Sequence, residues 1–257
     1  MRRIAMTRIA KMLASLGMVA LLSASLAAQT TGASRFDAAI RSRAAQQLSS
    51  KQQFRNVKAA VEDGIVTLTG SVDLYQQRLD AAHQIRKVHE VQGVRNLIAV
   101  SSEAVSDAQL KSELNRKLHF DRIGYDNLFN YVTASVKNGN VTLTGQTMLG
   151  VDRDSAFALA AGTPGVKELD NNITLAPVSF SDDSIREGAV RAIYHDSELS
   201  RYGADPALPI RIVVDNGKLI LDGTVETQMD KNIAGIRAAQ VFGAFSVQNN
   251  LRVDSKS

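Results

Sequence analysis

Side chains that could bind a metal are few in this chain and poorly spaced. It has four histidines and no cysteine. His83 and His89 are six residues apart in one predicted helix, so they lie on different faces, whereas a helical metal pair needs a spacing of about four. His119 and His195 stand apart from the other histidines. The sequence therefore predicts no metal site and gives no support for a bound cofactor.

The acidic and hydroxyl side chains do not form a recognisable catalytic set either. Asp152 and Asp154 occur where a helix is predicted to begin, and negative charge is favourable there because of the helix dipole. A catalytic carboxylate pair would need a partner acid in a cleft, and none can be inferred. Signatures of serine hydrolases and of the phosphate-binding P-loop are missing. We therefore expect a protein that is not an enzyme and has no small-molecule substrate.

The clearest pattern in the chain is a stretch that occurs three times. Residues 63–70 (DGIVTLTG) return as residues 138–145 (NGNVTLTG) and, in altered form, as residues 216–223 (NGKLILDG). Three sets of equivalent residues recur in the copies, and within each set the members are separated by 75 and then 78 residues. They are the leading glycines Gly64, Gly139 and Gly217, the closing glycines Gly70, Gly145 and Gly223, and the asparagines Asn96, Asn171 and Asn249. This spacing indicates a tandem array of three copies of one small module.

Each copy predicts the same order of elements. Asp-Gly or Asn-Gly between two alternating apolar runs is typical of a β-hairpin with a type I′ turn. An amphipathic helix follows, from 74 to 89 in copy one, and a glycine is expected to end it (Gly93, Gly165 and Gly243). A third strand comes next, and another helix precedes each hairpin. The Ser-Asp pairs at 106–107 and 181–182 are predicted helix N-caps.

The predicted fold class is therefore α+β, with three tandem α-β-β-α-β modules. A helical crossover permits parallel pairing of the second and third strands. A small three-stranded mixed sheet with two helices on one face would bury the apolar sides. The expected modules are 34–100, 104–177 and 178–257. Copies two and three have longer approaches to their hairpins, 119–130 and 197–209, which either reflect structural drift or mark a functional edge.

Residues 1–27 have the features of a secretory signal peptide. Arg2, Arg3, Arg8 and Lys11 precede an uncharged apolar run, and Ser25-Leu26-Ala27 resembles a cleavage site. An uncleaved N-terminal anchor is the alternative. The apolar run is short for a membrane span, and we expect none after removal of the signal. Without cysteine a lipid anchor is not expected. The predicted location is the periplasm.

Charge is distributed unevenly once the signal peptide is set aside. The remaining chain has 26 basic and 26 acidic side chains, so a nucleic-acid partner loses its support. Copy one carries ten basic and six acidic side chains, net +4, whereas copies two and three have net charges of −1 and −2. This asymmetry is either ordinary surface variation or a sign that copy one contacts an anionic surface, where each Lys or Arg contributes about 1 kcal/mol.

The repeated pattern resembles the BON-domain family. Copy two carries it most fully, with Asn138-Gly139, the run 141–145 (VTLTG), Gly165-Val166 and Asn171. Copy three departs from it, because Ile220-Leu221-Asp222 replaces Thr-Leu-Thr. A signal peptide followed only by such modules looks like the OsmY-like periplasmic members of the family. The resemblance implies a non-enzymatic envelope protein, acting in envelope maintenance or osmotic stress, that associates with phospholipid membranes or envelope proteins.

Two functional hypotheses follow. In the first, a surface around the second helix of copy one docks on anionic phospholipid; its residues are Leu74, Tyr75, Arg78, Leu79, Arg86 and Lys87. In the second, the protein is a chaperone-like or protein-binding stress factor of the periplasm. The repeated asparagines either bond the backbone near the third strand or line a shared surface, and the first explanation is favoured because a structural need recurs in every copy.

Overall fold

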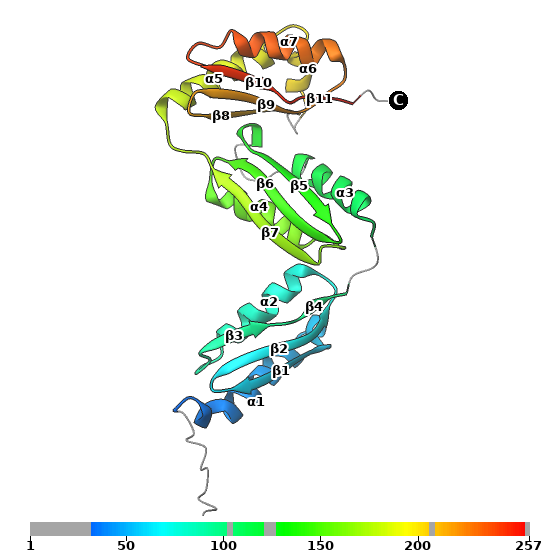
Figure 1. The fold of residues 1–257 in the computed structure, drawn as a ribbon, viewed down its shortest axis with the longest axis vertical. Helices are drawn as coiled ribbons and strands as arrows, with labels where there is room; N and C mark the ends of the chain where they lie inside the picture. Colours follow the sequence, from blue (N-terminus) through cyan, green and yellow to red (C-terminus); the bar gives the residue numbers. More distant parts are fainter. Residues whose placement is uncertain (1–31, 102–104, 121–126, 206–208, 255–257) are drawn as a thin grey trace, which may run out of the picture.

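The structure, a computed structural model, describes residues 32–101, 105–120, 127–205 and 209–254. Three α+β modules follow one another along the long axis of the molecule (Figure 1). The predicted signal peptide, residues 1–27, lies outside the described residues.

The three modules repeat one order of elements. Module 1 consists of η1 (Ser34–Phe36), α1 (Asp37–Ser49), η2 (Gln52–Phe54), β1 (Val57–Glu62), β2 (Ile65–Val72), α2 (Tyr75–Arg86), β3 (Gly93–Asn96) and β4 (Ala99–Val100). Module 2 consists of α3 (Asp107–Phe120), η3 (Asn127–Phe129), β5 (Tyr131–Lys137), β6 (Asn140–Thr147), α4 (Gly150–Ala161) and β7 (Glu168–Leu175). Module 3 consists of α5 (Phe180–Tyr194), α6 (Ser200–Gly203), β8 (Ile210–Asp215), β9 (Lys218–Val225), α7 (Gln228–Ala239), β10 (Ser246–Asn249) and β11 (Arg252–Val253).

The sheet topology agrees with the predicted fold class. The first two strands of each module pair antiparallel, and the third pairs parallel with the second. The third strand is continuous in module 2 but interrupted in modules 1 and 3, where it forms β3 with β4 and β10 with β11. In each module the two helices cover the same face of the sheet (Figure 1). A separate hydrophobic core lies between helices and sheet in every module.

The hairpin turns have the geometry that the sequence predicts, and an aspartate holds each of them. Both central residues of each turn have positive φ, as a type I′ turn requires; for example Asp63 is at 50° and Gly64 at 76°. The turn's two backbone N–H groups donate to one carboxylate in the first turn of the module's first helix, over 2.6–3.0 Å. These carboxylates belong to Asp37, Asp107 and Asp182.

The closing glycines and the repeated asparagines serve the backbone. Gly70, Gly145 and Gly223 have φ between 111° and 129°, and a Cβ on any of them would overlap a carbonyl oxygen at or just before the start of the neighbouring strand. The amide of Asn96 donates to the carbonyl of Arg78 in α2 (2.8 Å) and accepts from the N–H of Ile98 (3.2 Å). Asn249 repeats both bonds. In modules 1 and 3 this amide therefore ties the third strand to the second helix, and in module 2 Asn171 accepts from the N–H of Ile173 (3.2 Å).

Two details differ from the sequence-based expectation. None of the three predicted glycines ends its helix: α2 stops at Arg86, α4 at Ala161 and α7 at Ala239, and Gly93 begins β3. The position that glycine fills in the other modules is taken by Glu90, with φ of 70°. Ser181 is not an N-cap, because α5 begins earlier and Ser179 Oγ accepts from the N–H of Asp182 (3.2 Å). Ser106 does cap α3 through the N–H of Gln109 (3.3 Å).

Candidate functional site

The first half of α2 contacts module 2 rather than an open surface. Arg78 Nη1 forms an ion pair of 2.5 Å with Glu168 Oε1 at the start of β7. The ring of Tyr75 packs against the core of module 2, and burial raises the pKa of its hydroxyl. Leu74 and Leu79 are half-buried. Tyr75 and Arg78 of the expected membrane-binding surface therefore lie at a contact between modules, which the spacing of residues along α2 could not reveal.

The C-terminal end of α2 is different. Arg86 and Lys87 are exposed. Arg95 of β3 is exposed too, but on the other face of the sheet, because its neighbour Asn96 bonds α2 and successive side chains of a strand alternate between the two faces. Within the described part of the chain the side chains of Arg86 and Lys87 form no hydrogen bond or ion pair. We call Arg86 and Lys87 the basic end of α2. It is the part of the expected surface that the structure leaves accessible.

Module 3 packs on module 2 through β8. All of β8 except Asp215 is buried, whereas β1 alternates between buried and exposed residues. Leu128 and Phe129 of module 2 lie against the core of module 3. Arg211 of β8 is only 1 % exposed, and its guanidinium donates to the carbonyl oxygen of His119 at 2.6 Å. Burial lowers the pKa of Arg211 to about 10.

This contact accounts for the altered sequence of copy three. Asp222, which stands where the other copies have threonine, is paired across the sheet with Arg211. The charge of Asp222 also acts on the Tyr131 hydroxyl of module 2, and burial raises the pKa of Asp222. On the module 2 side, burial lowers the pKa of His119 to about 4, with Arg211 and Arg252 adding to the effect. The imidazole is therefore uncharged at neutral pH.

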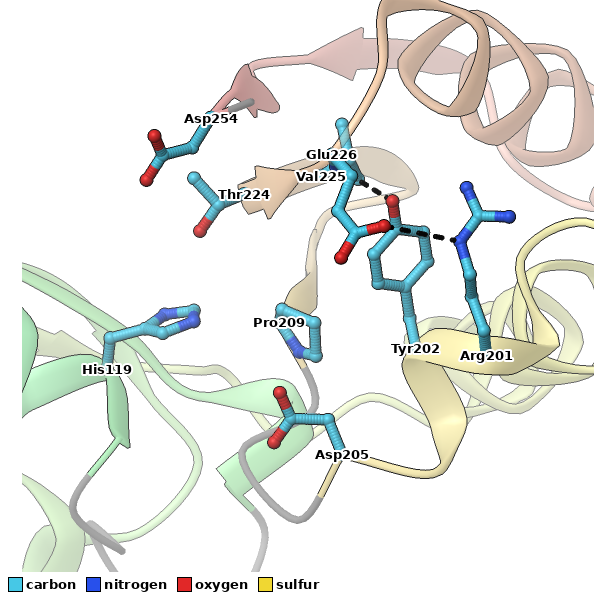
Figure 2. A pocket seen from close by; sticks show the side chains of 9 residues that line it. All are labelled: His119, Arg201, Tyr202, Asp205, Pro209, Thr224, Val225, Glu226 and Asp254. Carbon is cyan, nitrogen blue, oxygen red and sulfur yellow. Dashed lines mark hydrogen bonds and ion pairs between the residues drawn. The ribbon is translucent and has the colours of Figure 1, made fainter. Parts of the chain in front are cut away.

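Two hollows flank the junction between modules 2 and 3. One has a volume of about 350 Å³ and is lined by His119 from module 2 and by residues around Tyr202 and Glu226 from module 3 (Figure 2). The other, of about 620 Å³, is lined by α3 residues such as Lys111 and by Arg252. The two long segments that precede the hairpins of modules 2 and 3 are residues 119–130 and 197–209. The described residues at their ends both lie at this junction.

The polar groups around Tyr202 at the first hollow are bonded to one another. The Tyr202 hydroxyl donates to Asp230 Oδ2 (2.7 Å) and accepts from the N–H of Glu226 (2.8 Å; Figure 2). Arg201 forms an ion pair of 2.5 Å with Asp230. Burial raises the pKa of Tyr202, and the hydrogen bonds that Asp230 accepts lower the pKa of its carboxyl against the opposing effect of burial. Tyr202 therefore holds α6 against α7 rather than presenting a reactive hydroxyl.

The acidic residues near the start of α4 are structural. Asp152 is buried, accepts from Asn130 Nδ2 (3.0 Å) and accepts from the N–H of Leu149 (3.3 Å), so it caps the helix. Asp154 is paired with Arg153 on the surface. Across the described residues no three His, Asp or Glu side chains are grouped closely enough to hold a metal ion. No helix in those ranges is long and apolar enough to cross a membrane.

The repeated fold corresponds to a known family. The BON domain matches three times, over residues 36–102, 106–177 and 182–255. Because these matches cover most of the chain, the protein belongs to the BON-domain family. It is 30% identical, over 149 residues, to the outer membrane lipoprotein DolP of Haemophilus influenzae; the alignment covers 58% of this chain and 67% of DolP.

Similar solved structures include two from secretion systems or the periplasm. CdsD, a structural protein of the type III secretion system of Chlamydia trachomatis, is 13% identical, with 86% of this chain and 93% of that chain covered and a TM-score of 0.25. The PrgH periplasmic domain is 12% identical, with 82% and 100% covered and a TM-score of 0.21. Scores this low carry no argument about function.

Proposed function

We propose that the chain is a non-enzymatic protein of the bacterial cell envelope that binds the surface of anionic phospholipid membranes peripherally. Its place is the periplasm, and its role is envelope maintenance or the response to osmotic stress. Membership of the BON-domain family and similarity to a protein named as an outer membrane lipoprotein support the envelope assignment. The modules act as binding units, with the bilayer surface or an envelope protein as partner.

The accessible basic end of α2 is the observation that carries this proposal. Arg86 and Lys87 come from the last turn of a helix, where positive charge also suits the helix dipole, so their presence alone has a structural explanation. Their side chains are nevertheless exposed and bonded to no group among the described residues. The module is also the positively charged one, at net +4. Each of these side chains would contribute about 1 kcal/mol near an anionic surface.

Co-sedimentation with vesicles tests the proposal. Residues 28–257 are mixed with phosphatidylcholine vesicles, with or without phosphatidylglycerol, at low and moderate salt. The double variant R86E/K87E should lose the component of binding that depends on phosphatidylglycerol and is weakened by salt. The matched control is K111E/R116E, which reverses two exposed charges on α3 of module 2 and should keep it. Equal loss in both variants would contradict a site on α2.

A protein partner is the second candidate, and the hollows between modules 2 and 3 favour it. Both modules contribute to them, and they are large enough to receive side chains of a peptide. If no vesicle of either composition binds the chain, a photo-crosslinker placed at Ser112, on the rim of the larger hollow, should trap an envelope protein. A crosslinker at Arg43, on α1 of module 1, is the control.

A further inference from the structure

Three phenylalanines lie fully in solvent at one end of module 3. Phe180 is 90 % exposed, Phe242 is 98 % exposed and Phe245 is 87 % exposed. They are three of the eight phenylalanines in the chain. Aromatic side chains normally bury most of their surface, so a group that is almost wholly exposed calls for an explanation. We call these three residues the phenylalanine tip.

The tip is one structural unit although its residues are distant in sequence. Phe180 begins α5, whose Asp182 accepts from both N–H groups of the β8–β9 turn. Phe242 and Phe245 lie in the loop between α7 and β10. The N–H of Phe245 donates to the carbonyl of Gly217 in the same turn (2.9 Å), and its ring lies over that glycine. Two loops and a helix start are therefore held together at this end of the module (Figure 1).

The fold does not require aromatic residues there. The register of the strands matches Phe245 with Gln92 in module 1 and with Lys167 in module 2, and the N–H of each of these makes the same bond to the turn glycine. The other two positions correspond to Arg35 and His89 in module 1, and to Val105 and Pro164 in module 2. Since module 1 makes the same turn contact with polar residues at all three positions, the phenylalanines of module 3 serve something outside the fold.

The charges around the tip nearly cancel. Asp183 is paired with Arg186 at 2.5 Å, and Asp182 is occupied by the turn. Exposed Asp215 and Lys218 flank the turn and carry opposite charges. Unlike the basic end of α2, this surface offers no excess of positive charge to an anionic partner. Its attraction must come from the removal of apolar surface from water.

We propose that the phenylalanine tip inserts into the interface of a phospholipid bilayer, whatever the charge of its headgroups. The rings project from a helix start and a loop and are almost wholly exposed, so they do not line a groove. A fluid bilayer accommodates such a surface without a complementary shape. Phenylalanine is among the residues that peripheral proteins bury at the boundary between headgroups and acyl chains. This inference rests on the proposed function and adds a second, uncharged membrane contact. Two contacts in one chain would raise the apparent affinity by effective concentration.

Because the chain has no tryptophan, a single tryptophan reports on the tip directly. F242W and F245W should each shift to shorter emission wavelengths with pure phosphatidylcholine vesicles at high salt, and brominated lipid should quench them. M229W is the matched control: Met229 is 69 % exposed at the other end of α7 and should not shift. An unchanged spectrum of F242W and F245W with vesicles of every composition would overturn the proposal.

A loss-of-binding variant gives the second measurement. F242S/F245S should weaken binding to phosphatidylcholine vesicles about a hundredfold, taking about tenfold for each ring moved out of the interface. The control V151S/M229S removes two exposed apolar side chains elsewhere and should bind as the parent does. Both variants should keep the parent melting temperature, because the changed residues are exposed.

The two proposals fail in different ways. If R86E/K87E binds like the parent while the emission of F242W still shifts, the proposal for the basic end of α2 is wrong and the proposal for the tip is supported. If the emission of F242W never shifts while R86E/K87E still reduces the phosphatidylglycerol-dependent binding, the proposal for the tip is wrong and the proposed function stands. An emission shift that depends on protein concentration without vesicles would assign the tip to a second copy of the chain, which contradicts the proposal.

Discussion

The guanidinium of Arg211 in module 3 donates a hydrogen bond of 2.6 Å to the main-chain carbonyl of His119 in module 2. The side chain of Arg211 is the largest fully buried one among the described residues. In the other modules the corresponding strand positions carry Lys58 and Thr133, paired with Thr69 and Thr144 rather than an aspartate. The sheet face that is exposed at these positions in module 1 therefore forms a contact with module 2 in module 3.

Replacing Arg211 by alanine should destabilise the chain by about 2–3 kcal/mol, because a buried carbonyl loses a charged donor and a cavity is left. The free energy of unfolding is measured by urea denaturation. K58A is the control, because Lys58 occupies the same position in module 1 and is exposed there. A cost below about 0.5 kcal/mol, as for an ordinary surface residue, would show that Arg211 does not hold the junction.

The junction should also respond to acid through His119. Burial and the charges of Arg211 and Arg252 lower its pKa from 6.5 to about 4, although Asp205 acts in the opposite direction. Between these two values the unfolded chain binds a proton that the folded chain does not. The free energy of unfolding should therefore fall as the pH falls from 6.5 to 4, by at most about 1.4 kcal/mol per pH unit.

Urea unfolding across this window checks the effect, with H119Q as the comparison because glutamine does not titrate. Carboxylates elsewhere in the chain titrate in both proteins, so the difference between them isolates His119. That difference should be constant above pH 6.5 and should change as the pH approaches 4. If the two proteins lose stability in parallel at all pH values, His119 does not contribute.

Patterns among neighbouring residues predicted the fold of each module. Contacts between residues distant in sequence could not be predicted in this way. The hairpin turns follow from adjacent residues such as Asn138 and Gly139, whose need for positive φ is a property of the turn itself. The aspartates that bind these turns, such as Asp107, lie about thirty residues away and repeat at a different spacing, so no short motif reveals them.

The candidate site was predicted only in part for the same reason. The spacing of residues along α2 shows which side chains share a surface, but not that module 2 covers Tyr75 and Arg78. The alternation of β8 predicted one buried face, formed by Ile210, Ile212 and Val214; the second buried face depends on the packing of module 2. The phenylalanine tip was missed because its residues meet only through the turn at Gly217.

Removing a turn-binding carboxylate should cost more than its position at a helix start suggests. In D182A, the N–H groups of Asn216 and Gly217 lose a charged acceptor at 3.0 and 2.8 Å, and the second bond is buried. We expect a loss of about 2–3 kcal/mol, measured by urea unfolding. E187A, on the same helix, removes an exposed carboxylate whose partner Arg191 is also exposed, and should cost less than about 1 kcal/mol. Equal costs would contradict a special role for Asp182.

Reversing Arg78 should loosen the contact between modules 1 and 2 without reducing membrane binding. Arg78 faces Glu168 at 2.5 Å, and their side chains are 20% and 52% exposed, so the pair itself contributes less than about 1 kcal/mol. R78E puts two carboxylates together and should expand the molecule in small-angle X-ray scattering. The charge-swapped variant R78E/E168R should restore the parent dimensions. In vesicle co-sedimentation R78E should bind like the parent; a loss as large as that of R86E/K87E would return Arg78 to the membrane-binding surface.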